Sequence, residues 1–257
     1  MSPFVIILIL AVLQGITEML PVSSSGHLAL GRHFFDLEAD AGWVEVFLHT
    51  GTLASIILYY RKRIWTLIHG FFTGQKHIQR QCYIVVAASI PVCISGFVAN
   101  KFLDEILNNL VLIAVCLMTT GALLLSLFKK LPEERELSPA RALSIGLMQA
   151  IAILPGISRS GITIVTARHC GIAPKQAAEF SFLISLIPLF GASAVKTLEA
   201  AETGMGGLNP MHITIGALIA AITGYVALAI LNRMLSSNTF RYFGFYCALA
   251  GILLLIA

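Results

Sequence analysis

The sequence predicts an all-α integral membrane protein that forms a single membrane domain over residues 1–257. Hydrophobic residues make up 57% of the chain and charged residues only 12%, a composition far from that of soluble globular proteins. Several apolar runs are long enough to cross a bilayer, and two more are interrupted by Ser, Gly and Pro. The net charge of +4 comes without a basic patch interleaved with aromatic residues, so we expect no nucleic-acid partner.

Six uninterrupted apolar segments are the predicted transmembrane helices. The length of each falls within the range of about 17 to 25 residues that a membrane-spanning helix needs. In chain order they are Trp43–Tyr60, Cys82–Ala99, Leu107–Phe128, Ala178–Thr197, Met211–Leu231 and Arg241–Ala257.

Two further apolar stretches, Phe4–Gly31 and Ala142–Gly171, are each broken in the middle by Pro, Gly and several Ser. Neither is therefore predicted to be a continuous transmembrane helix. Irregular backbone at membrane depth survives only where protein or a wet cavity satisfies its polar groups. Each stretch is predicted to form a re-entrant hairpin of two short helices.

The distribution of Lys and Arg predicts how these elements cross the membrane, because cytoplasmic loops carry an excess of both residues. Basic residues gather at Arg61–Arg80, Lys129–Arg141 and Arg233–Arg241, which are predicted to lie inside. The connections at 36–40, at 101–105 and around Glu199 and Glu202 are acidic and are predicted to lie outside. Three crossings then separate the two hairpins, so the second hairpin enters from the opposite face.

The sequence thus predicts an inverted repeat, with one unit at about residues 1–128 and the other at about 141–257. The broken segments QGITEMLPVSSSG (Gln14–Gly26) and QAIAILPGISRSG (Gln149–Gly161) support it, because they match at a constant offset of 135 residues. At that offset Ser23 aligns with Ser158 and Ser25 with Ser160. Duplicated broken helices in membrane proteins commonly mark a polar ligand site near the bilayer middle.

In the first hairpin, Gln14 and Glu18 are four residues apart and share one helical face. An intramembrane acid by default faces a cavity or a partner, although Glu18 could also cap the following turn. Three serines and an imidazole come next: Ser23, Ser24, Ser25 and His27. The serines fit a polar helix N-cap, and a helix N-terminus of this kind also binds anions.

In the second hairpin, Arg159 is the only basic residue between Arg141 and Arg168. A guanidinium in an apolar segment requires an anionic partner, and its planar fork suits phosphate or carboxylate oxygens. A structural ion pair with Glu18 is one explanation. The neighbouring hydroxyls favour an oxyanion pocket, best suited to phosphate, and they belong to Ser158, Ser160 and Thr163.

The motifs QGITEMLPVSSSGH and PGISRSGIT resemble the two signature motifs of the undecaprenyl-pyrophosphate phosphatase family, the BacA-type enzymes. This resemblance covers nearly the whole chain. It implies hydrolysis of a C55 isoprenyl pyrophosphate to the monophosphate, which recycles the lipid carrier for cell-wall polymers. It also implies a divalent cation, Mg²⁺ or Ca²⁺, with Glu18 as its one protein carboxylate because Gln14 is neutral. The enzyme would lie in the bacterial cytoplasmic membrane, with its site opening to the outer, periplasmic face.

We expect Ser24 to attack the terminal phosphorus, with His27 or Glu18 taking its proton and Arg159 stabilising the transferred phosphoryl group. His27 as the nucleophile, or direct attack by water, are open alternatives. The residues expected to bind substrate are Gln14, Ser23, Ser25, Ser158, Ser160 and Thr163.

A flippase or transporter of the lipid phosphate is the alternative function, because inverted repeats with broken helices are common in transporters. An anion transporter would use Arg159 and the helix ends, but would have little use for a clustered hydroxyl, carboxylate and imidazole. The expected partners are the isoprenyl pyrophosphate and membrane lipids, and a homodimer is the assembly we consider.

Overall fold

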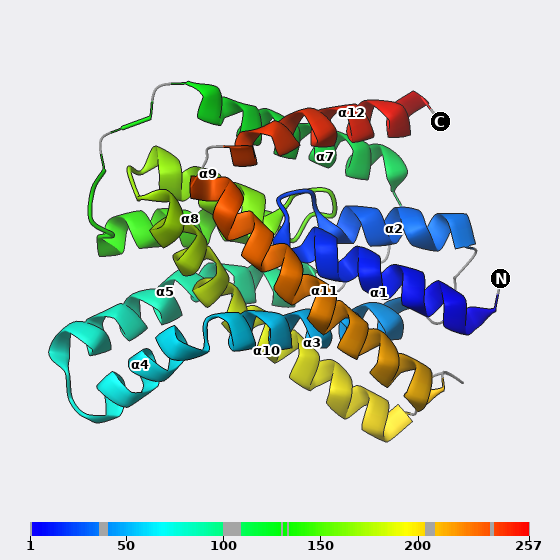
Figure 1. The fold of residues 1–257 in the computed structure, drawn as a ribbon, viewed down its shortest axis with the longest axis horizontal. Coiled ribbons are helices and arrows are strands. Elements are labelled where there is room, and N and C mark those ends of the chain that lie inside the picture. The colour runs from blue at the N-terminus through cyan, green and yellow to red at the C-terminus, as the bar shows by residue number, and fades with distance from the viewer. Residues whose placement is uncertain are drawn as a thin grey trace.

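The computed structural model describes residues 2–35, 41–99, 109–129, 131–132, 134–203, 209–236 and 239–256, and every element in these ranges is helical (Figure 1). The predicted outside connections at 36–40 and 101–105 lie outside these ranges, as does Lys130. The α-helices are α1 (Pro3–Met19), α2 (Ser24–Phe35), α3 (Ala41–Tyr59), α4 (Arg61–Phe72), α5 (Lys76–Ala99), α7 (Leu110–Leu125), α8 (Pro139–Ile151), α9 (Arg159–His169), α10 (Pro174–Thr203), α11 (Pro210–Ser236) and α12 (Phe243–Ile256), with short 3₁₀ turns at Ser126–Phe128 and Thr239–Tyr242.

Within the described residues, five helical segments are long and apolar enough to cross a membrane. They correspond to five of the six predicted spans, and the all-helical membrane architecture is confirmed at this level. The remaining span, Trp43–Tyr60, is a shorter apolar helix, Trp43–Tyr59. The five segments are Lys76–Val98, Leu110–Phe128, Pro174–Glu199, Pro210–Leu235 and Thr239–Ile256.

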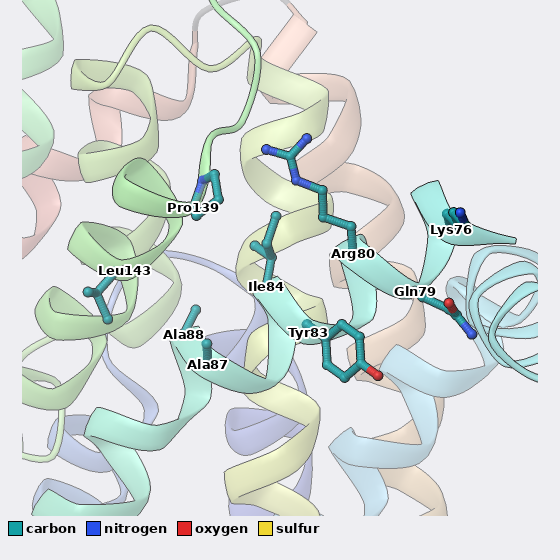
Figure 2. Close-up of a pocket in the computed structure, with 9 residues that line it drawn as sticks. All are labelled: Lys76, Gln79, Arg80, Tyr83, Ile84, Ala87, Ala88, Pro139 and Leu143. Carbon is teal, nitrogen blue, oxygen red and sulfur yellow. The ribbon is translucent and has the colours of Figure 1, made fainter. Parts of the chain in front are cut away.

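The outer faces of these helices are apolar, as the faces of a protein surrounded by lipid should be. Only 11% of the most apolar window of α5 is buried inside the protein, and Phe97 is 86% exposed. The groove between α5 and α8 continues this surface, with Ile84 and Leu143 in its walls and the basic side chains of Lys76 and Arg80 near the start of α5 (Figure 2). Exposed apolar area on this scale is stable only in an apolar environment.

The basic segment after α3 forms a helix, α4, where the sequence analysis expected a connecting loop. Gly70 of α4 lies directly against the side chain of Ile78 in α5, so the two helices pack together. Arg63 also binds Glu179 of α10, with 2.7 Å between Nε and Oε1. These contacts order a segment whose charge pattern alone predicted only its side of the membrane.

Both broken stretches divide into two short helices that lie side by side (Figure 1). The first stretch breaks between α1 and α2, and the second between α8 and α9. Each connecting turn contains a residue with left-handed backbone, Ser23 with φ of 68° and Gly156 with φ of 95°. Helical hydrogen bonding cannot continue through such residues, which explains the break at the Ser, Gly and Pro clusters.

Equivalent packing positions the two helix pairs. α1 packs on α11, where Gly15 lies against the backbone of Ala220, and α8 packs on α5, where Gly146 lies against the backbone of Ala88. A side chain at either glycine would overlap a carbonyl oxygen of the facing helix. These close contacts leave the α1–α2 and α8–α9 turns beside each other in the centre of the bundle (Figure 1).

Candidate active site

The two turns are joined by the hydroxyl of Ser23. Ser23 Oγ accepts hydrogen bonds from the backbone N–H of Gly156, at 3.0 Å, and from that of Gly26, at 3.3 Å. A β-carbon on Gly26 would lie only 3.3 Å from the Cα of Gly156, so the turns approach closely because Gly26 lacks a side chain. One serine therefore caps α2 and holds the α8–α9 turn in place.

The same hydrogen bonds recur in the second turn at the predicted offset. Ser158 Oγ accepts from the N–H of Gly161 at 3.1 Å, as Ser23 Oγ does from Gly26. The hydroxyl oxygens of Ser158 and Ser160 are 3.3 Å apart, and those of Ser23 and Ser25 are separated by the same distance. The sequence alignment of the two segments at 135 residues therefore corresponds to an equivalence in these side-chain hydrogen bonds, while the backbone φ differs, at 68° for Ser23 and −74° for Ser158.

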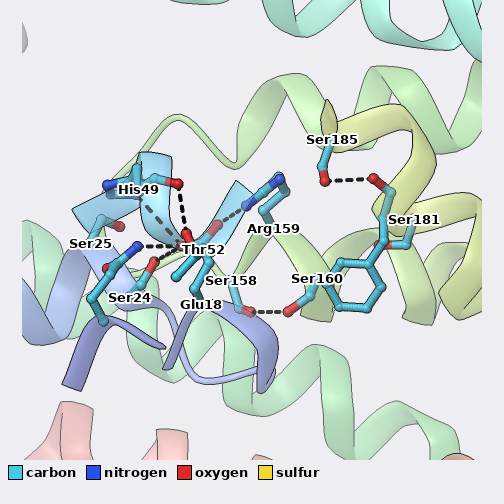
Figure 3. A network of polar contacts seen from close by, with 12 residues as sticks. Glu18, Ser24, Ser25, His49, Thr52, Ser158, Arg159, Ser160, Ser181 and Ser185 are labelled. Atoms are coloured by element: carbon cyan, nitrogen blue, oxygen red, sulfur yellow. Dashed lines mark hydrogen bonds and ion pairs between the residues drawn. The ribbon is translucent and has the colours of Figure 1, made fainter. Parts of the chain in front are cut away.

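Glu18 lies where the two turns meet, and its side chain is only 3% exposed. Its Oε2 accepts a hydrogen bond of 2.5 Å from Ser24 Oγ and one of 3.2 Å from Gln14 Nε2. Its Oε1 pairs with Nη2 of Arg159 (Figure 3). The ion pair considered in the sequence analysis is therefore present, and the same carboxylate also holds a serine hydroxyl.

Arg159 begins α9 directly after its N-cap residue, Ser158. Its Nη2 is engaged by Glu18, but Nη1 is buried and has no hydrogen-bond partner in the described part of the chain. A buried donor of this kind is costly unless a ligand or water satisfies it. Arg159 is thus held by one nitrogen, while the hydrogen-bonding capacity of the other is unsatisfied among the described residues.

A cavity of about 270 Å³ lies beside this cluster. Its walls combine the polar groups of both turns with apolar side chains such as Val92, Ile153 and Leu189. This mixed lining suits a molecule with a polar head and an apolar tail. The cavity includes six of the predicted site residues, which are Glu18, Ser23, Ser24, Ser25, Ser158 and Arg159.

Gln14, Ser160 and Thr163 are buried behind the cavity lining. Gln14 contacts the cavity only through Glu18. Ser160 Oγ donates to the carbonyl of Leu20 at 3.3 Å, and Thr163 Oγ1 donates to the carbonyl of Arg159 at 2.7 Å. The structure thus places these three residues next to the cavity-lining residues and the first turn, and their expected contact with substrate stays a prediction.

His27 points away from Ser24. Its Nδ1 lies 2.8 Å from the carbonyl oxygen of Ser23, and its Nε2 lies 2.6 Å from the hydroxyl of Tyr246 in α12. Both nitrogens of the imidazole thus lie next to groups other than the hydroxyl of Ser24, whose proton His27 was one candidate to accept. Its expected role in proton transfer or as a nucleophile stays a prediction.

The cavity also contains polar residues that the sequence analysis did not assign to the site: Thr17, His49 and Gln149. His49 Nε2 lies 3.6 Å from Glu18 Oε2, while its Nδ1 lies 2.8 Å from the carbonyl of Glu45. Gln149 is fully buried and aligns with Gln14 at the offset of 135 residues. That alignment is the one sequence signal that could have added Gln149 to the candidate residues.

Comparison with known proteins places this chain in a family. The family model described as "Bacitracin resistance protein BacA" matches residues 7–253. The chain belongs to the BacA family. The predicted resemblance is thereby confirmed over nearly the full length of the sequence.

Three relatives of this BacA chain have the same name. A protein of Halothermothrix orenii named undecaprenyl-diphosphatase is 33% identical, over 97% of this chain and 96% of its own length. A protein of Thermosipho africanus with the same name is 36% identical, over 96% of this chain and 97% of its own length. A third protein with this name, from Acinetobacter baumannii, is 33% identical, over 97% of this chain and 94% of its own length. Family membership and the apolar helices together identify a multi-pass membrane protein.

The donor set of this BacA chain limits how a divalent cation could bind. Among the described residues, no group of three or more His, Cys, Asp or Glu side chains could hold a metal ion. Two oxygen donors nevertheless fit a metal ion, namely the carboxylate of Glu18 and the amide Oε1 of Gln14, which is buried and has no hydrogen-bond partner in the described ranges. Hard cations such as Mg²⁺ and Ca²⁺ accept both kinds of oxygen. The remaining ligands would have to come from substrate and water.

Proposed function

We propose that the protein hydrolyses undecaprenyl diphosphate, a C55 isoprenyl diphosphate, to the monophosphate and inorganic phosphate, and so recycles the lipid carrier for cell-wall polymers. One observation carries this proposal: the buried carboxylate of Glu18 holds both the hydroxyl of Ser24 and the guanidinium of Arg159 at the edge of a cavity. A nucleophile, a base and an anion-binding group are thus in contact. The name shared by the relatives supports the same reaction.

In the proposed mechanism Ser24 Oγ attacks the terminal phosphorus of the substrate and transfers its proton to Glu18 Oε2, 2.5 Å away. The new bond joins Ser24 Oγ to phosphorus, and the bond from phosphorus to the bridging oxygen breaks, so the lipid monophosphate leaves. Water then attacks the phosphoserine and releases inorganic phosphate. Glu18 is well placed for this proton transfer because its oxygen already accepts the serine hydroxyl.

Positive charge and oriented N–H groups would stabilise the transferring phosphoryl group, the main source of catalysis in this chemistry. Arg159 supplies the unpaired Nη1. α2 and α9 both begin at the cavity, at Ser24 and Arg159, and their N-termini favour anions. These groups come from both hairpins, so neither hairpin alone forms the site.

We further propose that a divalent cation, Mg²⁺ or Ca²⁺, binds at Glu18 and the amide oxygen of Gln14. When bound, it would neutralise diphosphate charge. The buried, unpartnered Oε1 of Gln14 supports this assignment. Both residues lie on one face of α1, but the amide Nε2 of Gln14 faces Glu18 in this structure, so the amide would have to turn for its oxygen to reach the same cation.

The membrane arrangement that we propose has six spanning helices and two re-entrant hairpins, α1–α2 and α8–α9, in two inverted units of about 1–128 and 141–257. The recurrence of the Ser23 hydrogen bonds at Ser158 supports this arrangement, as does the equivalent packing of α1 on α11 and α8 on α5. We propose that the site opens to the periplasmic face of the cytoplasmic membrane.

The direct test is release of inorganic phosphate from undecaprenyl diphosphate by the purified protein in detergent. Because detergent leaves no gradient or second compartment, release supports the phosphatase over a flippase, which the names of the relatives do not favour either. Ser24→Ala is expected to lower the rate about a thousandfold or more, as loss of a catalytic serine does elsewhere.

The matched control is Ser144→Ala, at an exposed serine of α8 whose hydroxyl bonds only the carbonyl of Ala140. This variant should keep the parental rate. Substantial activity in Ser24→Ala would reject Ser24 as the nucleophile and favour His27 or water, which trapping of a phosphorylated residue would then separate. Failure of the parent protein to release phosphate would reject the proposed function.

A further inference from the structure

We propose that Tyr246 is a positioning residue of the active site, which acts through His27 on the turn that carries Ser24. The Tyr246 hydroxyl lies 2.6 Å from His27 Nε2, and the two rings are stacked with centroids 5.7 Å apart and an angle of 11° between their planes. Tyr246 lies on α12, 219 residues along the chain from His27. This inference rests on the proposed function and gives α12 a part in it.

The hydrogen-bond partners of His27 decide which of its nitrogens carries a hydrogen. Nδ1 lies 2.8 Å from the carbonyl oxygen of Ser23, which can only accept a hydrogen bond. Nδ1 therefore carries the hydrogen, and in the neutral imidazole Nε2 accepts from the hydroxyl of Tyr246. Both nitrogens are occupied by groups other than Ser24, so His27 has no free nitrogen for the serine proton.

These bonds hold a turn that the chain would otherwise avoid. Ser23 has a φ of 68°, and it is the only residue other than glycine with a positive φ in the described part of the chain. Side chains disfavour this conformation, and residues with it persist where surrounding contacts hold them. The Ser23 carbonyl accepts from the backbone N–H of His27 at 3.2 Å and from its Nδ1 at 2.8 Å, and stacking on Tyr246 limits rotation of the imidazole ring.

The position of Ser24 depends on this turn. With Ser23 in the left-handed conformation, its Oγ reaches the N–H of Gly156 and α2 begins at the next residue. The hydroxyl of Ser24 then lies 2.5 Å from Glu18 Oε2. Tyr246 and His27 thus determine where the nucleophile stands without contacting the reacting phosphorus.

Three substitutions of His27 separate a positioning role from a chemical one. Asn can place its Nδ2 near the position of His Nδ1 and so donate to the Ser23 carbonyl, but it cannot act as a base or a nucleophile. Gln places its amide nearer to Nε2, and Ala replaces neither nitrogen. We expect kcat for phosphate release to fall about a hundredfold in His27→Ala and His27→Gln, with KM little changed, because substrate binding is retained while the nucleophile is misplaced.

In His27→Asn we expect kcat to recover at least about tenfold over His27→Ala, because the hydrogen bond to Ser23 is restored. Recovery of this kind is incompatible with His27 as an essential base or nucleophile. If His27→Asn folds, as judged by size-exclusion elution and thermal unfolding, and is no more active than His27→Ala, the positioning role is overturned.

Tyr246→Phe tests the inference independently of His27 and removes only the hydroxyl. We expect a loss of kcat of roughly five- to tenfold, the size that one neutral hydrogen bond supports, again at constant KM. The control is Tyr242→Phe, at a tyrosine that is 53% exposed and bonds no described residue through its hydroxyl. Equal kcat in Tyr246→Phe, Tyr242→Phe and the parent overturns the inference, even where His27→Asn does not fold.

These comparisons distinguish failure of this inference from failure of the proposed function. Phosphate release by the parent protein tests the function, and the ratios among the variants test the positioning role. The parent protein could release phosphate while Tyr246→Phe keeps the parental kcat and His27→Asn is no more active than His27→Ala. That outcome would support the phosphatase function and reject the positioning role of Tyr246.

Discussion

Glu18 links the two hairpins through charge, because it lies on α1 of the first hairpin and pairs with Arg159, which begins α9 of the second. An isolated buried carboxylate would be unstable in an apolar protein, and Glu18 is held by Arg159, Ser24 and Gln14. Arg159 balances the negative charge of Glu18, and Glu18 in turn provides an acceptor for the proton of Ser24. One side chain therefore links the stability of the site to its proposed chemistry.

Glu18→Gln separates these two contributions, because it keeps the shape of the side chain and removes its charge. We expect phosphate release to fall by about a hundredfold or more, since an amide does not accept the proton of Ser24. We also expect the free energy of unfolding to fall by about 3 to 5 kcal/mol, because Arg159 becomes an uncompensated buried charge. Phosphate-release assays and thermal unfolding in detergent measure the two effects.

The control for this variant is Glu202→Gln, at an exposed position of α10. It should change neither the rate nor the unfolding temperature. A Glu18→Gln protein that works at a third or more of the parental rate would contradict the assignment of Glu18 as the base.

Much of the site was predictable at the residue level because its key residues are rare in their surroundings. A carboxylate and a guanidinium in apolar segments predicted Glu18 and Arg159, and the repeated serines predicted the turns. For His49 the sequence left two roles open, as a cavity residue or as a hydrogen-bond partner of Glu45, and the packing of α3 against the first hairpin brings it to the cavity. The direction of His27 was not predictable, because it depends on the left-handed backbone of Ser23.

At the level of elements, close helix packing positions the two hairpins before any polar contact forms. α8 approaches α5 so closely that a β-carbon on Gly146 would lie 2.8 Å from the Cα of Ala88 and closer still to its carbonyl oxygen. Thr120 of α7 supports the α8–α9 turn from the other side, because its hydroxyl donates to the carbonyl of Gly156 and accepts from the N–H of Ser158. The turn is therefore held by Thr120 of α7 and by Ser23.

Gly146→Ala tests this packing. The added methyl group must displace α8 from α5, and overpacking of this kind costs about 1 to 3 kcal/mol. We expect a lower unfolding temperature together with slower phosphate release, because the displaced helix carries the turn that leads to Arg159.

Gly191→Ala is the matched control within α10, because a β-carbon there would meet nothing within 4 Å. Alanine is the better helix former by about 0.8 to 1 kcal/mol, so this variant should be as stable as the parent or more stable. Equal unfolding temperatures in the two variants would show that α8 and α5 do not pack as described.

The elements themselves were largely predictable from apolar length, and the two helix breaks from Ser, Gly and Pro. The helix α4 was not predictable, because its basic residues indicate a cytoplasmic position whether the segment is a loop or a helix. It is stabilised by the ion pair of Arg63 with Glu179 and by the packing of Gly70 on Ile78. Composition alone does not indicate that these segments contact each other.

For the whole molecule, the inverted arrangement that we propose would explain how two unequal hairpins build one site. The first unit supplies Glu18 and Ser24, and the second supplies Arg159 at the position equivalent to Ser24. A symmetric pair would place two like groups at the cavity, whereas divergence places a nucleophile opposite a cation. That division favours chemistry on a phosphate over simple passage of an anion.

The membrane topology can be measured with single cysteines in a protein whose five native cysteines have been replaced. Gln75→Cys lies between α4 and α5, and Glu202→Cys lies near the end of α10. The basic residues predict that the first is labelled from the cytoplasm and the second from outside. Labelling of both from the same side with a membrane-impermeant maleimide would contradict the proposed inverted units.

The central claim is that Arg159 and Glu18 form a phosphoryl-transfer site between the two turns, and the rate of phosphate release by Arg159→Ala tests it most directly. The account predicts a folded protein whose release of phosphate from undecaprenyl diphosphate is slower by about a thousandfold or more, as for other arginines that stabilise a transferring phosphoryl group. An Arg159→Ala protein that folds and keeps the parental rate would contradict the account.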